Sequence, residues 1–343
     1  MMTKATLYEK LRNKEVKCLA CNHGCLIPEG KTGICGVRKN LRGELDLMVY
    51  NKPIAVNIDP IEKKPLFHFY PGQGAFSLGT IGCNFGCEFC QNWDISQLSK
   101  TPEADISKIL EETQEWPAKK IIDYCLSNNL KIIAYTYNEP TIWAEYALET
   151  MKLAKKNGIK NVWVSNGFFT DKTLKEISPY LDAVNIDLKS FSEKFYNKIC
   201  KAKLEPVKNN IKQIYDFGIW EEITTLIIPT LNDSEKELSQ IAKFLFSISK
   251  DLVWHISAFY PAYKMINLQP TPQETLIKAY QIGKKAGLNY VYTGNIPDEN
   301  YESTYCPKCG EKLIERWGIE MIQNKLKDGK CFKCGVKIPG RWQ

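Results

Sequence analysis

The feature that most constrains the fold is a repeated alternation of apolar runs with amphipathic stretches. Seven runs rich in β-branched and aromatic residues lie at 75–82, 131–137, 161–167, 183–189, 221–229, 253–261 and 289–294. Amphipathic stretches between them lie at 105–128, 142–157, 233–248 and 272–286. Short apolar runs that alternate with helices are typical of a parallel sheet covered on both faces. The pattern therefore predicts an α/β chain of βα units that forms a partial or complete barrel.

Polar residues gather where the predicted strands end. The second strand is followed by N-E-P, the third by S-N-G and the seventh by G-N, while D-L-K ends the fourth. In βα barrels the loops after the strands build the active site. Asn, Pro and Gly also end strands as ordinary turn residues. Several such turns at one end of a barrel nevertheless favour a functional site there.

The thirteen cysteines fall mostly into three groups of short spacing. Eleven of them lie at 18, 21, 25 and 35, at 83, 87 and 90, and at 306, 309, 331 and 334. The polar N-terminus lacks the apolar core of a signal peptide, and no run approaches the roughly 18 apolar residues of a membrane span. We therefore expect a cytoplasmic protein with no membrane segment, whose cysteines are thiolate metal ligands and not disulfides.

The middle group lies in the stretch GCNFGCEFCQNW, directly after the first predicted strand. Cys83, Cys87 and Cys90 have C-x3-C-x2-C spacing. Three thiolates can bind three irons of a [4Fe–4S] cluster and leave the fourth iron open for another ligand. The alternatives are a zinc site with a fourth ligand from elsewhere, or cysteines without a metal.

Several stretches of the chain resemble a known family. The stretches KKPLFHFYPGQGAFSLGTIGCNFGCEFCQNWDIS, YTYNEP, SNGF, NIDLKSF, IPTLNDSEKEL and YTGN resemble radical S-adenosylmethionine (SAM) enzymes. They are similar to the branch of the pyruvate formate-lyase activating enzyme and, more closely, to the AmmeMemoRadiSam system radical enzyme family. The resemblance implies a partial (β/α)6-type TIM barrel and a [4Fe–4S] cluster. It further implies reductive cleavage of SAM to a 5′-deoxyadenosyl radical, which abstracts hydrogen from an unidentified protein, nucleic acid or metabolite.

The resemblance also implies cofactor contacts after the first three strands. Phe89 is the aromatic residue usual between the second and third cysteines. Asn138 and Glu139 fall where the family binds the amino group of SAM, although the usual glycines are absent here. Ser165 and Asn166 are expected to contact the ribose or the carboxylate.

The later strands supply four more implied contacts. Asp187 and Lys189 resemble the pair that holds the ribose hydroxyls and the carboxylate, although a helix cap and a solvated lysine are the ordinary alternatives. His255 is expected to contact cofactor or substrate, with a core histidine as its alternative. Asn295 is expected to border the adenine.

The last cysteine group predicts a small metal-bound module. Cys306, Cys309, Cys331 and Cys334 form two C-x2-C knuckles, each followed by glycine. This is strong spacing for a zinc ribbon, and rubredoxin-type iron is the alternative. A module this small is expected to need its metal in order to fold.

The first group predicts a closed site whose metal the sequence leaves open. Cys18, Cys21, Cys25 and Cys35 can hold zinc, which is slightly favoured, or an auxiliary cluster; His23 can replace one thiolate. These groups suggest three parts: an N-terminal cysteine-rich domain at 1–74, the core barrel at 75–300 and the tail at 301–343.

Two cysteines lie outside the groups. Cys125, in the middle of a predicted helix, is expected in the core. Cys200, beyond the fourth strand, is a candidate radical relay near the barrel mouth, but a packed or surface thiol is the favoured interpretation.

Charge and partners separate the remaining functional alternatives. The net charge is +7, and nine Lys or Arg against four Asp or Glu lie from Cys306 onward. A non-catalytic metal-binding or nucleic-acid-binding scaffold is one alternative, weakened by the lack of aromatic residues interleaved with the lysines. Simple electron transfer and activation of a glycyl radical enzyme are two others. Expected partners are an electron donor of flavodoxin or ferredoxin type and the proteins of the AmmeMemoRadiSam system.

Overall fold

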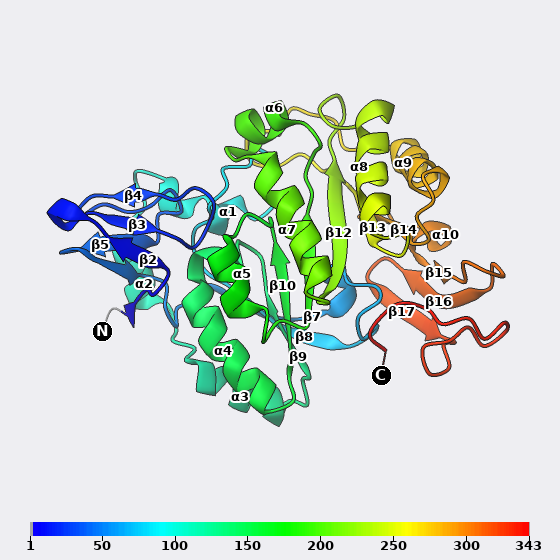
Figure 1. Cartoon of the computed structure of the whole chain (residues 1–343), viewed down its shortest axis with the longest axis horizontal. Helices are drawn as coiled ribbons and strands as arrows, with labels where there is room; N and C mark the ends of the chain where they lie inside the picture. The colour runs from blue at the N-terminus through cyan, green and yellow to red at the C-terminus, as the bar shows by residue number, and fades with distance from the viewer. Residues whose placement is uncertain (1–2, 343) are drawn as a thin grey trace. The chain divides into compact units, whose positions relative to one another are not determined.

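The structure, a computed structural model, describes residues 3–342 of the chain and has an α/β fold (Figure 1). Its contacts divide the chain into two compact units. Unit 1 contains the chain up to Asp59, Gly74–Asp182 and Ile199–Ala202. Unit 2 contains Pro60–Gln73, Ala183–Lys198 and the chain from Lys203 onward.

Unit 1 begins with two small antiparallel sheets. One has the order β1-β6-β5, with strands Thr3–Lys4, Glu44–Leu47 and Arg38–Leu41. The other has the order β2-β3-β4, with strands Tyr8–Lys10, Val16–Cys18 and Leu26–Ile27. Val16, Ile27 and Leu45 are fully buried beneath these sheets. The four N-terminal cysteines lie within or beside them.

The parallel strands of unit 1 are short and apolar, as the sequence predicts. They are β8 (Gly74–Gly79), β9 (Ile132–Tyr135) and β10 (Lys160–Ser165), preceded by β7 (Ala55–Pro60). In the parallel register Ile133 faces both Phe76 and Asn161. Every residue of β9 is buried, because its neighbours and the covering helices exclude water from both faces.

The helices of unit 1 lie in the amphipathic stretches of the sequence and beside them. They are α1 (Trp93–Ser96), α2 (Ile106–Glu112), α3 (Ala118–Ser127), α4 (Ala144–Lys156) and α5 (Asp171–Ile177). The amphipathic stretch 105–128 contains two helices, because Pro117 restricts the residue before it and starts α3. Cys125 is fully buried on α3, which confirms its place in the core. Helix α4 packs against both α3 and α5 (Figure 1).

Unit 2 continues the same alternation. Its parallel strands are β11 (Ala183–Asp187), β12 (Trp220–Ile227), β13 (Val253–Ala258) and β14 (Val291–Gly294). Its helices are α6 (Glu193–Phe195), α7 (Leu204–Asp216), α8 (Glu235–Ile248), α9 (Gln273–Lys285) and α10 (Glu299–Glu302). Side chains cap two of the helix starts: Ser234 Oγ accepts from the N–H of Glu237 (3.3 Å), as Thr170 Oγ1 in unit 1 accepts from that of Thr173 (3.2 Å).

The tail forms a third small antiparallel sheet within unit 2. Its order is β15-β16-β17, with strands Thr304–Tyr305, Lys312–Trp317 and Glu320–Asn324. Cys306 and Cys331 are buried there in one apolar cluster with Phe67 and Tyr292. The tail therefore shares its core with the rest of unit 2.

Short 3-10 and π turns connect several elements. They lie at Arg12–Lys14, Ile61–Lys63, Leu98–Lys100, Pro140–Trp143 and Tyr196–Cys200.

The parallel sheet is open. Strand order follows chain order in both units, and β7 and β14 are end strands with one neighbour each. The expected barrel is therefore not closed. In the described part of the chain, no helix is long and apolar enough to cross a membrane.

Candidate functional site

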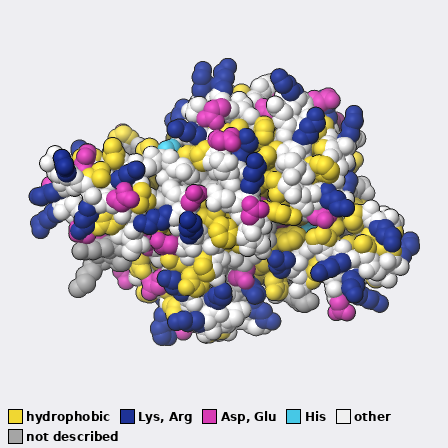
Figure 2. All heavy atoms as spheres, in the orientation of Figure 1, with side chains coloured by type: hydrophobic (Ala, Val, Ile, Leu, Met, Phe, Trp, Pro, Cys, Tyr) yellow, Lys and Arg dark blue, Asp and Glu magenta, His cyan; other side chains and the backbone are white. Residues whose placement is uncertain are grey.

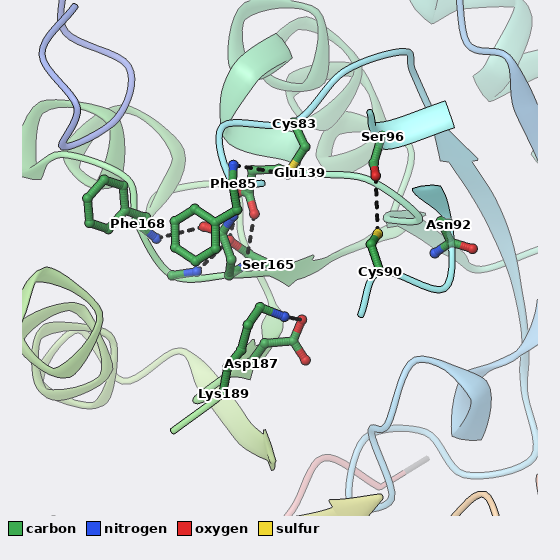
Figure 3. Close-up of polar contacts among 12 residues, drawn as sticks. Cys83, Phe85, Cys90, Asn92, Ser96, Glu139, Ser165, Phe168, Asp187 and Lys189 are labelled. Carbon is green, nitrogen blue, oxygen red and sulfur yellow. Dashed lines mark hydrogen bonds and ion pairs between the residues drawn. The ribbon is translucent and has the colours of Figure 1, made fainter. Parts of the chain in front are cut away.

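The three-cysteine loop lies between β8 and α1 in unit 1. Cys87 is buried, whereas Cys83 and Cys90 are partly exposed. The backbone N–H of Phe85 donates to Cys83 Sγ (3.4 Å), and the Cys90 thiol lies 3.1 Å from the Ser96 hydroxyl (Figure 3). One short segment thus offers three sulfur atoms of differing exposure.

Asn138 holds the backbone where this loop leaves β8. Its Nδ2 donates to the carbonyl of Gly82 (2.8 Å) and to Thr80 Oγ1 (3.0 Å). Its Oδ1 accepts from the N–H of Thr80 (3.2 Å) and from Trp143 Nε1 (3.2 Å). The side-chain amide expected to contact a cofactor is therefore engaged in shaping the loop.

A second support comes from the segment that contains Cys200. The N–H of Gly86 donates to the carbonyl of Cys200 (2.9 Å), and the N–H of Glu88 donates to the carbonyl of Ile199 (3.2 Å). Lys201 and Glu88 form an ion pair (3.3 Å). Cys200 is fully buried, so its backbone supports the loop while its thiol is packed.

The Glu139 carboxylate is buried at the end of β9. Its Oε1 accepts from the N–H (3.0 Å) and the hydroxyl (2.5 Å) of Thr141 and from Ser165 Oγ (2.8 Å). Its Oε2 accepts from the N–H of Asn166 (2.7 Å). Oε2 thus accepts from one donor where Oε1 accepts from three, so it has capacity for a further donor.

These bonds connect the ends of β9 and β10 with the three-cysteine loop. Asn166 Nδ2 donates to Asn84 Oδ1 (2.7 Å), and Cys83 Sγ lies 3.7 Å from the same oxygen. Glu139 and Ser165 lie beside Phe85 of the loop in Figure 3. The expected residues Glu139, Ser165 and Asn166 therefore form one network with the cysteine loop.

Burial dominates the electrostatics of this network. It raises the pKa of Glu139, and the hydrogen bonds from Thr141, Asn166 and Ser165 lower that pKa only in part. Burial likewise raises the pKa of Cys83, while the Lys100 ammonium opposes this effect. Lys100 therefore favours negative charge at the loop.

Unit 2 contains the Asp187–Lys189 pair at the end of β11. Lys189 Nζ donates to Asp187 Oδ2 (2.9 Å), and both side chains are partly buried (Figure 3). The backbone of Lys189 is fixed by Tyr196 OH, which accepts from its N–H (3.1 Å), and by Asn232 Nδ2, which donates to its carbonyl (2.8 Å). The predicted pair is therefore formed, and its backbone is held from two sides.

His255 is buried on β13 and pairs with a carboxylate. Its Nε2 lies 2.6 Å from Glu222 Oε2, and the N–H groups of Phe67 and His68 donate to the same carboxylate (2.8 and 2.7 Å). Burial raises the pKa of Glu222, but the hydrogen bond from His255 and the neighbouring charges lower it below its ordinary value. His255 thus has the contacts of a core histidine, in addition to the cavity described next.

A cavity of about 320 Å³ in unit 2 is bordered by His255 and Asn295. Its wall also contains Ser257, Glu62 and Glu302. The volume lies at the lower end of the range for small-molecule sites. Asn295 is exposed at its rim, so both of these expected cofactor residues border one space.

The comparisons with known proteins decide the family. Residues 78–245, which contain the three-cysteine loop and the ends of β9 to β11, match the Radical SAM superfamily. The chain belongs to the radical SAM superfamily. It is therefore an enzyme, and its substrate is unidentified.

Two relatives of this radical SAM enzyme show how far the similarity extends. An uncharacterized protein of Methanocaldococcus jannaschii is 41% identical over 340 residues, which cover 98% of this chain and 99% of the relative. The pyruvate formate-lyase-activating enzyme of Clostridium pasteurianum is 22% identical over 167 residues, 49% of this chain and 67% of the relative. The chain is thus related to enzymes that activate glycyl radical enzymes.

The family implies an iron–sulfur cluster and SAM, and the loop fits the cluster. Cys83, Cys87 and Cys90 are three soft sulfur donors on one segment, the ligand type that iron–sulfur clusters require. Phe85 and Phe89 are buried beside them and limit access of water. Radical SAM enzymes also need a reductant as electron donor.

Sequence reasoning missed several residues of the network around the three-cysteine loop. Asn84 joins the loop to β10, Thr141 supplies two of the donors to Glu139, and Ser96 contacts Cys90. Asn84 directly follows Cys83 in the cysteine motif, and this position could have indicated that it belongs to the site. Thr141 lies two residues after Glu139, which caps the turn Pro140–Trp143, and this spacing was its signal. Ser96 carries no local pattern, because its contact with Cys90 arises only when the chain is folded.

The four tail cysteines form a compact group. The sulfur atoms of Cys306, Cys309, Cys331 and Cys334 all lie within 4.8 Å of one another. Two sulfur pairs are separated by 3.6 and 3.7 Å. Four thiolates bonded to one zinc at about 2.3 Å stand about 3.8 Å apart, so the group has the geometry of a mononuclear metal site.

Proposed function

We propose that this enzyme binds a [4Fe–4S] cluster through Cys83, Cys87 and Cys90 and uses it to cleave SAM reductively. When bound, the cluster and SAM supply a 5′-deoxyadenosyl radical that abstracts hydrogen from the substrate. The three thiols hold the cluster, and Phe85 and Phe89 limit the water that reaches it. Lys100 contributes positive charge at the loop.

The residues at the strand ends are proposed to bind SAM. Glu139 would accept a hydrogen bond from the amino group of SAM at Oε2. Ser165 and Asn166 would hold the Glu139 carboxylate in place for this contact. A buried anion that accepts from an ammonium group forms a charge-assisted hydrogen bond, which is stronger than a neutral one.

Asp187, Lys189, His255 and Asn295 are further proposed cofactor contacts, as the resemblance implies. Asp187 and Lys189 would hold the ribose hydroxyls and the carboxylate. His255 and Asn295 would contact the cofactor or the substrate from the wall of the cavity that both border. Phe89 and Asn138 would act through the loop, Phe89 by packing and Asn138 by fixing its backbone.

One observation carries the proposal: the network that runs from the three-cysteine loop to a buried carboxylate. Cys83, Asn84, Asn166 and Glu139 are consecutive members of this network. A buried carboxylate with a raised pKa, linked to the Cys83 thiol at the ends of two strands, is the kind of perturbed group that gathers at functional sites. The network supports a site that receives a cationic ligand next to the metal.

The finer family assignment is also part of the proposal. We place the enzyme in the AmmeMemoRadiSam system family, whose partner proteins would supply or receive its substrate. This placement rests on the resemblance of the sequence stretches given above. The proposed parts are the cysteine-rich domain at 1–74, the core at 75–300 and a zinc-bound tail at 301–343. A flavodoxin or ferredoxin in the cytoplasm would donate the electron.

Basic charge gives little support to a nucleic-acid-binding role. Figure 2 shows Lys and Arg side chains spread over the visible face with acidic side chains between them. Nucleic-acid sites usually gather their basic residues on one face. We therefore leave the substrate class open among proteins, nucleic acids and metabolites.

The experiment is anaerobic reconstitution followed by assay of 5′-deoxyadenosine after addition of dithionite and SAM. We expect product from the wild type and none from Cys87→Ala. The matched control is Cys125→Ala, which removes a buried thiol from α3 and should retain product formation. Wild-type protein with a reducible cluster that yields no product and does not bind SAM would contradict the proposal.

A further inference from the structure

The cavity bordered by His255 and Asn295 lies wholly within unit 2 and has a volume of about 320 Å³. Ser257 and Gly294 on its wall are among the last residues of β13 and β14. In α/β enzymes, ligands bind beyond the carboxyl ends of the parallel strands. A Cβ atom on Gly294 would lie 3.1 Å from Ser257 Oγ, so the glycine keeps this part of the wall open. The cavity therefore has the position of a ligand site.

Glu302 places a carboxylate with spare capacity on this wall. It is 2% exposed and belongs to α10, which packs against β14 and β16 (Figure 1). Its Oε2 accepts from the N–H groups of Asp298 (3.1 Å) and Gly318 (2.8 Å), and among the described residues no hydrogen bond or ion pair reaches Oε1. Burial raises the pKa of Glu302 to about 7, and the two hydrogen bonds lower it only in part. A cation in the cavity would supply the partner that this buried carboxylate lacks.

The second carboxylate on the wall, Glu62, is already paired. Its Oε1 accepts from the N–H of Gly72 (3.0 Å) and lies 3.6 Å from Arg316 Nε. Lys63 also borders the cavity, but its side chain is exposed, where water screens its charge. Glu302 is therefore the acidic group on the wall whose charge no neighbouring side chain offsets.

His255 offers a further acceptor to the same cavity. Its Nε2 lies 2.6 Å from Glu222 Oε2, and the other oxygen of Glu222 accepts from Trp220 Nε1 (2.9 Å). Against the effect of burial, the hydrogen bond from His255 and the neighbouring charges lower the pKa of Glu222. Glu222 is thus an anion that only accepts, so the proton of the neutral His255 ring is on Nε2 and its Nδ1 is an acceptor. The Ser257 hydroxyl, which can also accept, borders the same space.

The rest of the wall is mostly apolar and contains Pro65, Phe67, Ile296, Pro297 and Ile319. We propose that this cavity binds the substrate as a small molecule with a protonated amino group on an apolar body. An ammonium group has three donors, and Glu302, His255 and Ser257 offer acceptors. Its hydrogen bond to the Glu302 carboxylate is charge-assisted and stronger than a neutral one. The role of the bound amine as substrate rests on the proposed function, whereas its binding in the cavity does not.

The test is an anaerobic titration of the reconstituted protein with benzylamine, followed by nuclear magnetic resonance of the ligand. Benzyl alcohol and benzoate are the neutral and the anionic analogues of this probe. Because the charge-assisted bond is lost with both analogues, we expect benzylamine to bind at least about tenfold more tightly than either. Equal binding of the three compounds, tighter binding of benzoate or no binding of benzylamine would overturn the proposal.

The substitution Glu302→Gln locates the bound amine. The new side chain keeps an acceptor for the N–H groups of Asp298 and Gly318, so the variant should fold. We expect its affinity for benzylamine to fall about tenfold or more. The matched control is Glu299→Gln, the same change on the same helix, at a carboxylate that pairs with Lys312 and does not border the cavity. An unchanged affinity in Glu302→Gln, or an equal loss in both variants, would refute this site.

Competition with SAM separates this inference from the proposed SAM site. An amine can also bind at Glu139, which is proposed to accept from the amino group of SAM. We expect SAM at saturation to leave the affinity for benzylamine unchanged in the wild type, and Glu139→Gln to leave it unchanged as well. Displacement of benzylamine by SAM would overturn the inference. These titrations do not depend on 5′-deoxyadenosine, so failure of SAM cleavage is distinguishable from failure of amine binding.

Discussion

The substitution Glu139→Gln tests the proposed SAM site most directly. The new amide must place its NH2 group at one of two carboxylate oxygen positions. The Oε1 position faces three donors, whereas Oε2 faces only the N–H of Asn166 (2.7 Å), so the NH2 should take the Oε2 position. A buried donor left without its acceptor costs about 1–3 kcal/mol. We therefore expect the free energy of unfolding to fall by about that amount.

The same substitution should weaken SAM binding more than it weakens the fold. It replaces the anion at Oε2 with a donor, so the charge-assisted bond to the amino group of SAM is lost. Such a bond contributes about 1.5–3 kcal/mol, which corresponds to about 10- to 150-fold in the dissociation constant. Anaerobic calorimetry with SAM on the reconstituted protein measures this change, and urea unfolding measures the stability.

The matched control for Glu139→Gln is Ser165→Ala. Ser165 donates to Oε1 of the same carboxylate (2.8 Å), so its removal perturbs the network without removing the charge. We expect a loss of about 1 kcal/mol in stability and only a small change in SAM affinity. Equal SAM affinity in Glu139→Gln and Ser165→Ala would refute the reasoning and make Glu139 a structural residue.

Three further predictions concern unit 2. Chelation of the tail metal should release one zinc ion, which mass spectrometry of the intact protein detects as a loss of mass. The tail should then become sensitive to trypsin, because buried Cys331 shares a core with the rest of unit 2. A metal-free tail that resists trypsin would contradict this prediction. Burial raises the pKa of Glu302 from 4.5 to about 7, so its contribution to stability is present below about pH 4.5 and lost as the pH rises through 7. Glu302→Gln should therefore raise the melting temperature more at about pH 8 than at about pH 5. An equal effect at both pH values would contradict the raised pKa of Glu302. Burial lowers the pKa of His68 from 6.5 to about 4, so its contribution to stability is present above about pH 6.5 and lost as the pH falls through 4. In His68→Phe the free energy of unfolding should therefore depend less on pH between these two values. An unchanged slope of that free energy against pH would show that another group is responsible.

Local patterns predicted the parts of the fold that depend on local physics. The period of the apolar residues located the parallel strands, and side-chain caps such as Ser234 marked where helices begin. The split between α2 and α3 was missed because the amphipathic pattern continues across it. Pro117 was the available signal, since the residue before a proline is disfavoured in a helix.

The site was predictable only where its chemistry lies within one segment. The three-cysteine spacing and the strand-end residues were sufficient, as sequence patterns, to indicate the cofactor class. The partners Ser165 and Asn166 of Glu139 were not predictable, because they reach it only through the pairing of β9 with β10. For His255 the position on the strand suggested a ligand contact, and the structure adds a partner that the sequence did not indicate: the Glu222 carboxylate, which contacts the ring nitrogen Nε2.

The two outer cysteine groups show most clearly what spacing leaves undetermined. Both contain C-x2-C pairs, and spacing alone favours zinc in each. The backbone then sets the distances between sulfur atoms: the tail brings all four within 4.8 Å, whereas the N-terminal thiols enclose a cavity lined by Arg38. The separation of the sulfur atoms and the charge around them help to select the metal, and both are products of tertiary packing. Two groups with the same ligand type and similar spacing can therefore differ in the metal that they hold.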